Sequence, residues 1–430
     1  MRNSLLRREL RFAADHFPCD LTIAEESVIT AVTTTLKSGA WSMFTSQAVA
    51  KFEQEFSEFV GAKHCVFVTS CTAAIHASLV ALGVHSGCKV GFPAYTYIGT
   101  CLPALAMGCK PVFFDVQGDS PILAIDQLIA AFNKEDIDAA VVPLLFGMPI
   151  PRQNLEELKG IRGHRIVFDC AQFLGDKRVT EELVQLGPCC FSFGESKQLK
   201  VGEGGMIATN SAQIARVLRE FRHAGEIWRR HDTADVEWHE IHPRDVLDGL
   251  VASRPGMNLR PLAISAAIGS AKLAHLPQAL ADAREKAEVY SSVLRSSPHI
   301  ELPRNVSTWW TFPCVVKSGP IDRNTLLAML LYMRVPVGLH FPALLPAHPV
   351  MPRHPTLRPK YEPAGNFARN HLVLPLYGTL TKSHVSQIAE TLVSLLDEAH
   401  DDLPSLHVWA NEFLSTTPLK GLNAGLFISV

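Results

Sequence analysis

The sequence predicts an α/β fold with a mainly parallel sheet covered by helices on both faces, followed by a smaller α/β region. Short apolar runs alternate with helical segments over roughly the first half of the chain, which is typical of such a sheet. The chain has 430 residues, enough for about two or three domains. Its 47% apolar and 19% charged residues are ordinary for a globular protein.

Composition excludes several classes of protein. The formal net charge is −2, so no general nucleic-acid binder is expected. No apolar run reaches the roughly 18 residues that span a bilayer, so no membrane segment is predicted. The ten cysteines form no C-x-x-C pair and no zinc spacing, so we predict no metal site. They are expected to be small buried side chains of a soluble, cytoplasmic protein, with a stray disulfide as the alternative.

The first elements lead to a hydroxyl-rich turn. Residues 23–60 have a helical pattern, in which Phe52, Phe56 and Val60 recur every four residues. A strand is expected at 65–69 and a helix at 73–82, with Ser70-Cys-Thr72 between them. Free N–H groups and hydroxyls at a helix N-terminus form a general anion site. The alternative is that Ser70 or Thr72 is a plain N-cap.

The next strands end in aromatic and polar residues. Strands are predicted at 89–92, 111–116, 139–145 and 165–168, and a helix at 98–107. Tyr97 lies just past the first of them, where open α/β sheets place their ligands, and could stack on a planar ring or fill the core. Asp169 ends the last strand, where an unpaired carboxylate would be costly. It is either a helix N-cap or the partner of a protonated ring nitrogen.

A lysine lies between two further strands, expected at 189–193 and 206–209. Lys197 follows the first strand by four residues, and a glycine-rich turn, Gly202-Glu-Gly204-Gly205, follows it. Lysines are rarely buried unless they are paired or functional. A surface lysine in a hairpin connection is the alternative.

The second half contains a charged excursion and a smaller α/β region. Residues 223–251 show little periodicity, and their histidines, which we expect to be solvated, are His231, His239 and His242. A small-residue helix is expected at 264–276. The smaller region is predicted to have strands at 310–316 and 335–339, helices at 323–333 and 384–399, and loops at 340–342 and 374–377. We make no prediction for the tail from residue 401.

Five separated motifs together resemble the DegT-like sugar aminotransferases, which are fold-type I enzymes that use pyridoxal 5′-phosphate (PLP). The resemblance extends from about Leu36 to about Leu396. The motifs occur in the family's order: Ser70-Cys-Thr-Ala-Ala, Pro93-Ala-Tyr-Thr-Tyr, Asp169-Cys-Ala-Gln172, Ser192-Phe-x-x-x-Lys197 with Gly202-Glu-Gly-Gly, and Gly256-Met-Asn-Leu-Arg260. The resemblance implies a mixed, mainly parallel seven-stranded sheet in a large domain. It further implies that residues 1–20 are an extension, 21–275 the PLP-binding domain, 276–400 the small domain and 401–430 a C-terminal extension.

The resemblance also implies roles for individual residues. Lys197 would form the internal Schiff base and move protons, while Asp169 would pair with the pyridinium nitrogen. Gln172 would lie beside the phenolic oxygen, and Tyr97 would stack on the ring. The remaining contacts would be to the phosphate, from Thr72, the N–H of Ala73, Ser192 and, across a homodimer interface, Asn258.

The implied function is transfer of an amino group from glutamate or glutamine to a keto sugar nucleotide or cyclitol, through a pyridoxamine phosphate form. The alternatives are a PLP-dependent sugar dehydratase, in which a histidine replaces the lysine, an aromatising enzyme, and a regulatory or scaffold homologue. Departures from the family pattern concern the substrate more than the cofactor. They are Cys71 in place of glycine, Gly194 in place of histidine, residues 44–47 in place of a Gly-Pro turn, and Pro261 after Arg260.

Overall fold

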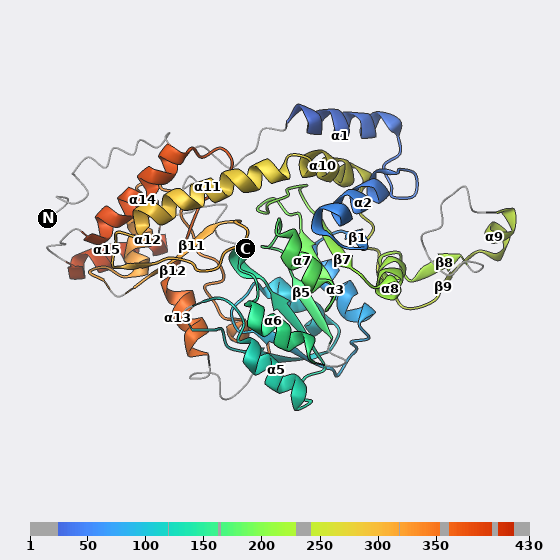
Figure 1. Ribbon diagram of the computed structural model, residues 1–430, viewed down its shortest axis with the longest axis horizontal. Coiled ribbons are helices and arrows are strands. Elements are labelled where there is room, and N and C mark those ends of the chain that lie inside the picture. The colour runs from blue at the N-terminus through green and yellow to red at the C-terminus, as the bar shows by residue number, and fades with distance from the viewer. Residues whose placement is uncertain are drawn as a thin grey trace. The chain divides into compact units, whose positions relative to one another are not determined.

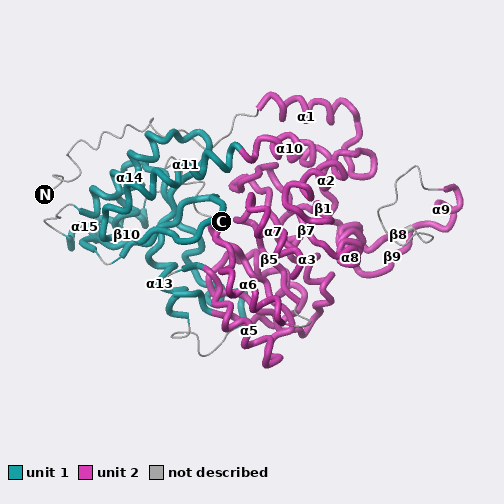
Figure 2. The backbone as a smooth tube through the Cα atoms, viewed as in Figure 1, with its two compact units in different colours: residues 1–23, 115–121, 278–430 teal, residues 24–114, 122–277 magenta. Residues whose placement is uncertain are grey.

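The structure is a computed structural model that describes residues 25–118, 120–161, 165–228, 242–317, 319–352, 361–397 and 403–416. The chain divides into two compact units (Figure 2). Residues 24–114 and 122–277 form what we call the large-sheet unit. Residues 1–23, 115–121 and 278–430 form the small-sheet unit.

The large-sheet unit is built on seven strands in the order β1-β7-β6-β5-β4-β2-β3 (Figure 1). The strands from β3 to β6 pair in parallel, and β7 pairs antiparallel with both β6 and β1. The mainly parallel, mixed sheet is therefore confirmed. The strands are β1 (His64–Val68), β2 (Lys89–Pro93), β3 (Lys110–Phe114), β4 (Ala139–Pro143), β5 (Ile166–Asp169), β6 (Cys189–Ser192) and β7 (Gly205–Thr209).

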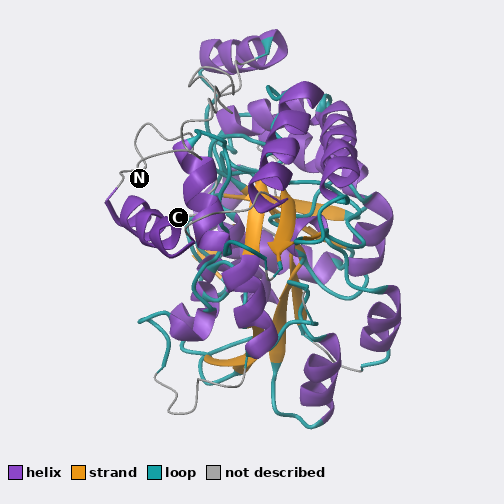
Figure 3. Ribbon diagram, turned by 90° about the vertical axis from the view of Figure 1, so that its left-hand side faces the viewer, coloured by secondary structure: helices purple, strands orange, loops and turns teal. Residues whose placement is uncertain are grey.

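Helices flank this sheet (Figures 1 and 3). Burial on both faces explains why its strands are continuous apolar runs rather than alternating patterns. The helices are α1 (Glu26–Ser38), α2 (Ala48–Val60), α3 (Cys71–Ala81), α4 (Leu102–Ala106), α5 (Ile125–Asn133), α6 (Arg152–Lys159), α7 (Lys177–Leu183), α8 (Ala212–Arg222) and α10 (Ala263–Leu273).

The phenylalanines that lie four residues apart in α2 pack this helix against the sheet. Phe52 lies 5.2 Å from the ring of Phe67 in β1 and 5.5 Å from that of Phe193. Phe56 lies 5.3 Å from the same Phe193 ring. A Cβ on Gly269 of α10 would come within 2.4 Å of the same Phe52 ring, so only glycine permits this close helix packing.

Two predicted helices are interrupted. The pattern at 23–60 forms two helices, because Gly39 adopts a left-handed conformation (φ 70°) that ends α1. The helix expected at 98–107 is a 3-10 turn, η1 (Ile98–Thr100), followed by the short α4. Pro103 has no N–H to donate, so one continuous helix through this segment would lack a hydrogen bond.

The charged excursion after α8 forms its own small sheet. Strand β8 (Glu226–Trp228) pairs antiparallel with β9 (Leu250–Ala252), and α9 (Pro243–Asp248) precedes β9. His242 is exposed just before α9, as expected for a solvated histidine. His231 and His239 lie outside the described residues.

The small-sheet unit contains a three-stranded antiparallel sheet in the order β10-β11-β12. An apolar core that includes Tyr290, Phe312, Leu330 and Leu392 joins this sheet to its helices. The strands are β10 (Ile300–Glu301), β11 (Phe312–Val316) and β12 (His371–Leu374). The helices are α11 (Leu276–Leu294), α12 (Arg323–Tyr332), α13 (Glu362–Asn370), α14 (Lys382–Asp397) and α15 (Leu403–Thr416), with a 3-10 turn η4 (Leu345–Ala347).

The strand predicted at 335–339 is wrong. The chain turns there, since the carbonyl of Val335 accepts a 2.9 Å hydrogen bond from the N–H of Val337. Only an isolated bridge, from Gly338 to Val373, connects this segment to the sheet. The third strand is instead β12, which was not predicted and which ends at Leu374, the first residue of the loop expected at 374–377. Both Val335 and Val337 are buried, which explains the apolar pattern without a strand.

The tail, for which we made no prediction, contains α15. Its aromatic side chains pack on the end of α12, with Tyr332 lying 5.7 Å from Trp409 and 6.0 Å from Phe413 between ring centroids. This packing orders residues 403–416 as part of the small-sheet unit. Among the described helices, none is both long and apolar enough to cross a membrane.

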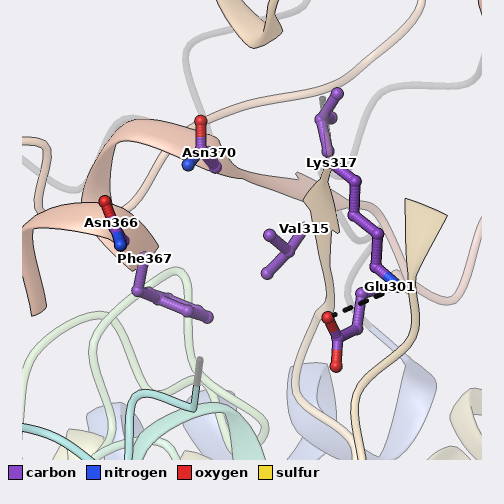
Figure 4. A pocket seen from close by; sticks show the side chains of 7 residues that line it. Glu301, Val315, Lys317, Asn366, Phe367 and Asn370 are labelled. Carbon is purple, nitrogen blue, oxygen red and sulfur yellow. Dashed lines mark ion pairs between the residues drawn. The ribbon is translucent and has the colours of Figure 1, made fainter. Parts of the chain in front are cut away.

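A pocket of about 480 Å³ lies in the small-sheet unit beside β10, β11 and α13 (Figure 4). A 3.7 Å ion pair between Glu301 and Lys317 lies on one side of the pocket, and Asn366 and Asn370 of α13 line the opposite side (Figure 4). Both charged side chains are partly exposed. The pocket is polar and open to solvent.

Candidate active site

Asp169 is the centre of the candidate site, at the carboxyl end of β5. Its neighbours β4 and β6 run parallel to β5, so the ends of these strands lie at the same edge of the sheet. Its backbone carbonyl accepts a 2.9 Å hydrogen bond from Leu144, and the next N–H, of Cys170, donates to Cys190 at 2.7 Å. The sheet thereby holds a buried carboxylate, 7% exposed, at its functional edge.

Three donors surround the Asp169 carboxylate. Thr100 Oγ1 donates to Oδ2 at 2.7 Å, and the backbone N–H of Ala171 donates to Oδ1 at 3.0 Å. The thiol of Cys71 lies 3.7 Å from Oδ1 and 3.5 Å from the carbonyl of Cys190, and its single proton can serve only one of them. Burial raises the pKa of Asp169, and these donors, together with Lys197, oppose the rise.

Lys197 lies on the loop between β6 and β7. Its backbone N–H donates to the carbonyl of Gly194 at 3.0 Å, which begins a turn immediately after the strand. Burial lowers the pKa of its ammonium, while the charge of Asp169 and the Cys71 side chain act in the opposite direction. Lys197 is half-buried, so it is not a fully exposed lysine, and its role in the site stays a prediction. A lysine with a lowered pKa is a better nucleophile and proton acceptor at neutral pH.

The N-terminus of α3 lies against the start of β7. A Cβ on Gly205 would come within 2.3 Å of the backbone of Ser70, so only glycine permits this approach. Because Gly205 pairs with Ser192 across β6 and β7, the Ser192 position is next to the N-terminus of this helix. A helix N-terminus attracts anions through its N–H groups and its dipole.

Ser70 is the N-cap of α3, as one of the two alternatives predicted, and the anion site at this helix N-terminus stays a prediction. Its side chain accepts a 3.1 Å hydrogen bond from the N–H of Ala73. The same N–H is predicted to bind phosphate, so a bound phosphate would share it with Ser70 or displace that contact. Thr72 occupies the second position of the helix and is half-buried.

Tyr97 and Thr72 both flank Gly99. A Cβ on Gly99 would lie 2.5 Å from Cε1 of Tyr97 and 2.9 Å from Oγ1 of Thr72. The ring of Tyr97 is 39% exposed, so Tyr97 does not fill the core. Two of the predicted ligand-binding side chains thus lie close together, around a glycine in η1.

Gln172 is buried and its amide orientation is determined by the backbone. Its Oε1 accepts a 2.8 Å hydrogen bond from the N–H of Phe146, in the turn after β4. Since the oxygen faces this donor, the amide NH₂ points in the other direction. The amide NH₂ is thus the group left to donate to another partner.

Asn258 lies apart from this group within the chain. Its backbone bridges His223 after α8, and its side chain is exposed. Nearby, Arg260 Nη1 lies 2.8 Å from His223 Nδ1, and the guanidinium lies 5.9 Å from the ring centroid of Phe44. Two of the departures from the family pattern, Phe44 and the Arg260-Pro261 step, therefore lie in one cluster.

Thr100 and Thr96 are the residues that sequence reasoning missed. They are four residues apart around the turn of η1, and their hydroxyl oxygens are 3.2 Å from each other. The available signal was a pair of hydroxyl residues at that spacing directly after a strand end. Nothing in the local sequence indicated that their partner is Asp169, 69 residues further along the chain.

Comparisons with known proteins agree on one family. The sequence model of the DegT/DnrJ/EryC1/StrS aminotransferase family matches residues 22–393. GDP-perosamine synthase of Vibrio cholerae is 25% identical over 358 residues, which cover 82% of this chain and 92% of that enzyme.

Two solved structures have the same fold. DesV of S. venezuelae is 25% identical, with a TM-score of 0.73 and coverage of 87% of this chain and 95% of that one. The E. coli GDP-4-keto-6-deoxy-D-mannose-3-dehydratase with bound hydrated PLP is 20% identical, with a TM-score of 0.74, and covers 87% of this chain and 99% of its own.

Proposed function

The chain belongs to the DegT/DnrJ/EryC1/StrS aminotransferase family, and from this premise we propose that it transfers an amino group from glutamate or glutamine to a keto group on a sugar nucleotide or cyclitol. It is a PLP-dependent aminotransferase of aminosugar biosynthesis. The proposed amino-group transfer rests on one observation. The Asp169 carboxylate is buried at the end of β5 and surrounded by hydrogen-bond donors.

The residues present fit PLP. An ionised carboxylate accepts about four hydrogen bonds. Among the described residues, Thr100, Ala171 and the shared Cys71 thiol supply at most three, so at least one position remains for a ring N–H. The N-terminus of α3, beside Gly205 of β7, offers an anion site. These two features match the two charged ends of the cofactor.

Each predicted residue then has a task that its environment supports. Asp169 would accept the ring N–H, and Gln172 would donate its NH₂ to the phenolic oxygen. The half-exposed ring of Tyr97 would stack on the cofactor. The phosphate would be held by Thr72, Ser192 and the N–H of Ala73, while Lys197 would hold the cofactor through Nζ.

When bound, PLP supplies an electron sink for the negative charge that develops at the substrate's α-carbon. Once the amino group of the donor has displaced it from the cofactor, Lys197 Nζ would be free to accept the α-proton and deliver it to the cofactor, which its lowered pKa favours. The role of Asp169 is to stay ionised and hold the ring proton, and Thr100 and Ala171 stabilise that state.

The proposal extends to the assembly. We propose a cytoplasmic homodimer in which the exposed Asn258 of each subunit reaches the phosphate of the other site. The cofactor would be held by the domain at residues 21–275.

The test is the visible absorption of the purified holoenzyme before and after excess glutamate or glutamine. We expect the cofactor band to bleach and one equivalent of 2-oxo acid per site to appear, with no response in the Lys197→Ala variant. A panel of keto sugar nucleotides and keto-cyclitols then identifies the acceptor by recovery of the band. A bound cofactor that responds to no amino donor would contradict transamination and favour dehydration. Failure of the wild-type protein to bind PLP at all would favour a regulatory homologue.

A further inference from the structure

Two buried threonines lie behind the Asp169 carboxylate, on the side of η1. Thr100 Oγ1 lies 2.7 Å from Asp169 Oδ2, and Thr96 Oγ1 lies 3.2 Å from Thr100 Oγ1. Both threonines are 1% exposed. Buried hydroxyls without hydrogen bonds are costly, so a chain of two that ends on a carboxylate is a specific arrangement.

The proton positions in this chain follow from the chemistry of the carboxylate. An ionised carboxylate has no proton to give, so Thr100 must donate its only hydroxyl proton to Asp169. The oxygen of Thr100 is then an acceptor, and the proton between the two threonines belongs to Thr96. The hydrogen bonds therefore run from Thr96 to Thr100 to Asp169, and each one strengthens the next. A protonated Asp169 can itself donate a proton, so the direction of these hydrogen bonds is then no longer fixed.

We propose that Thr100 is a positioning residue that keeps Asp169 ionised and oriented toward the ring nitrogen of PLP, with Thr96 polarising the Thr100 hydroxyl. This inference rests on the function proposed above. It assigns an effect on the cofactor to Thr100 of η1 and to Thr96 just before that turn, although neither is proposed to contact the cofactor directly.

Of the three donors to Asp169, the Thr100 side chain affects the ionisation of the carboxylate most strongly. The Ala171 donor is a backbone N–H, and the Cys71 thiol is a weak donor at 3.7 Å that is shared with a carbonyl. The hydrogen bond from Thr100 is the shortest of the three, and bonds to charged groups are the strong ones.

The η1 turn also links Thr100 to Tyr97, the residue predicted to stack on the cofactor ring. The N–H of Thr100 donates to the carbonyl of Tyr97 at 3.1 Å, and Tyr97 is the N-cap of η1. One 3-10 turn thus places both the residue that holds Asp169 and the residue predicted to stack on the ring. Burial raises the pKa of Asp169, and the Thr100 hydrogen bond is the largest of the effects that lower it.

The variants that test the inference are Thr100→Val, which keeps the shape and loses the hydroxyl, and Thr100→Ser, which keeps the hydroxyl. The direct readout is the ¹⁵N chemical shift of ring-labelled PLP bound to each protein, followed against pH. We expect the ring nitrogen of Thr100→Val to be protonated to a smaller extent than that of wild type across the pH range, since a carboxyl group that has lost a donor has a higher pKa and competes better for the ring proton. Thr100→Ser should restore the wild-type titration, and Thr96→Val should shift it in the same direction by less.

A second readout uses the protein without cofactor. Because burial raises the pKa of Asp169 in the folded state, this group stabilises the fold below its ordinary pKa and loses that contribution as the pH rises. Removing the Thr100 donor raises the pKa of Asp169 further, so Thr100→Val loses more stability than wild type as the pH rises. The difference in the free energy of unfolding between the two proteins should therefore widen from acid to neutral pH. In an Asp169→Asn background the widening should disappear.

The outcomes separate the two proposals. Wild-type protein that binds PLP and transaminates, with identical ¹⁵N titrations in Thr100→Val and Thr96→Val, would overturn the inference and leave the function standing. Wild-type protein that fails to bind PLP would overturn both. If Thr100→Val does not fold, Thr96→Val decides, because an unchanged ring titration in that variant contradicts the chain of hydrogen bonds.

Discussion

Gln172 Oε1 accepts a 2.8 Å hydrogen bond from the backbone N–H of Phe146, a residue that adopts a left-handed conformation with φ 54°. A large aromatic residue rarely takes this conformation, and such strain persists only where the surroundings hold it. The Phe146 side chain is fully buried. Gln172 therefore stabilises the turn after β4, in addition to its predicted contact with the cofactor.

Replacement of Gln172 separates these two tasks. Gln172→Ala leaves the buried N–H of Phe146 without an acceptor, which should lower the free energy of unfolding by about 1–3 kcal/mol. Gln172→Glu keeps an acceptor for Phe146 and loses the NH₂ donor. We expect it to change the absorption spectrum of bound PLP while the melting temperature changes less than in Gln172→Ala. Equal spectra in wild type and Gln172→Glu would contradict the cofactor contact.

Loss of the lysine should abolish turnover. Proton transfer by a positioned side chain contributes roughly 10²–10⁴-fold, so Lys197→Ala should reduce kcat by at least that factor. Circular dichroism and size-exclusion chromatography should show an unchanged fold and assembly. Lys197→Arg is the matched control, because it keeps a charge of similar reach but cannot deprotonate near neutral pH. Full transamination by either variant would refute the assignment.

The stability of the cofactor-free protein should depend on the charge of Lys197. Burial lowers the pKa of this group in the folded state, so the folded protein binds fewer protons here than the unfolded chain. Stability from this group is therefore lost at low pH and increases as the pH rises toward the ordinary lysine pKa. We expect Lys197→Met to be more stable than wild type at neutral pH in urea unfolding. The difference should diminish at alkaline pH, and a difference that does not vary with pH would contradict a lowered pKa.

Asp169 should matter more for rate than for stability. Asp169→Ala leaves the donors Thr100 and Ala171 without an acceptor, each costing about 1–3 kcal/mol. Removal of a buried carboxylate offsets part of that cost. The rate should fall on the order of 10²–10³-fold, the usual effect of removing a group that stabilises developing charge. Steady-state kinetics beside a thermal melt gives the comparison. Activity within a few-fold of wild type would rule out pairing with the ring nitrogen.

The predicted sharing of sites between subunits can be tested by mixing variants. Asn258 is exposed, so Asn258→Ala should change stability by no more than about 0.5 kcal/mol in the isolated chain. It should weaken PLP retention in equilibrium dialysis. A heterodimer of Asn258→Ala with Lys197→Ala would contain one intact site and regain activity. If a purified heterodimer of the two stays inactive, Asn258 does not act across the interface.

The sequence by itself determined the fold class and most of the strands, because burial on both faces leaves short, continuous apolar runs that are visible locally. It also located Lys197, Asp169 and Gln172 at the ends of those runs, since strand ends are marked by the change from apolar to polar residues. The motif order then identified the family, which the comparison with residues 22–393 confirms.

Only the tertiary structure decided which side chains meet. Thr100 and Asp169 are separated by 69 positions, and Gln172 and Phe146 by 26. The close approach of Gly205 to Ser70 depends likewise on the pairing of β7 between β6 and β1. Periodicity describes how a segment buries its own side chains and carries no information about the partner across the sheet. Hydrogen bonds at a strand edge depend on that partner, so the environment that tunes Asp169 emerges only when the chain is folded.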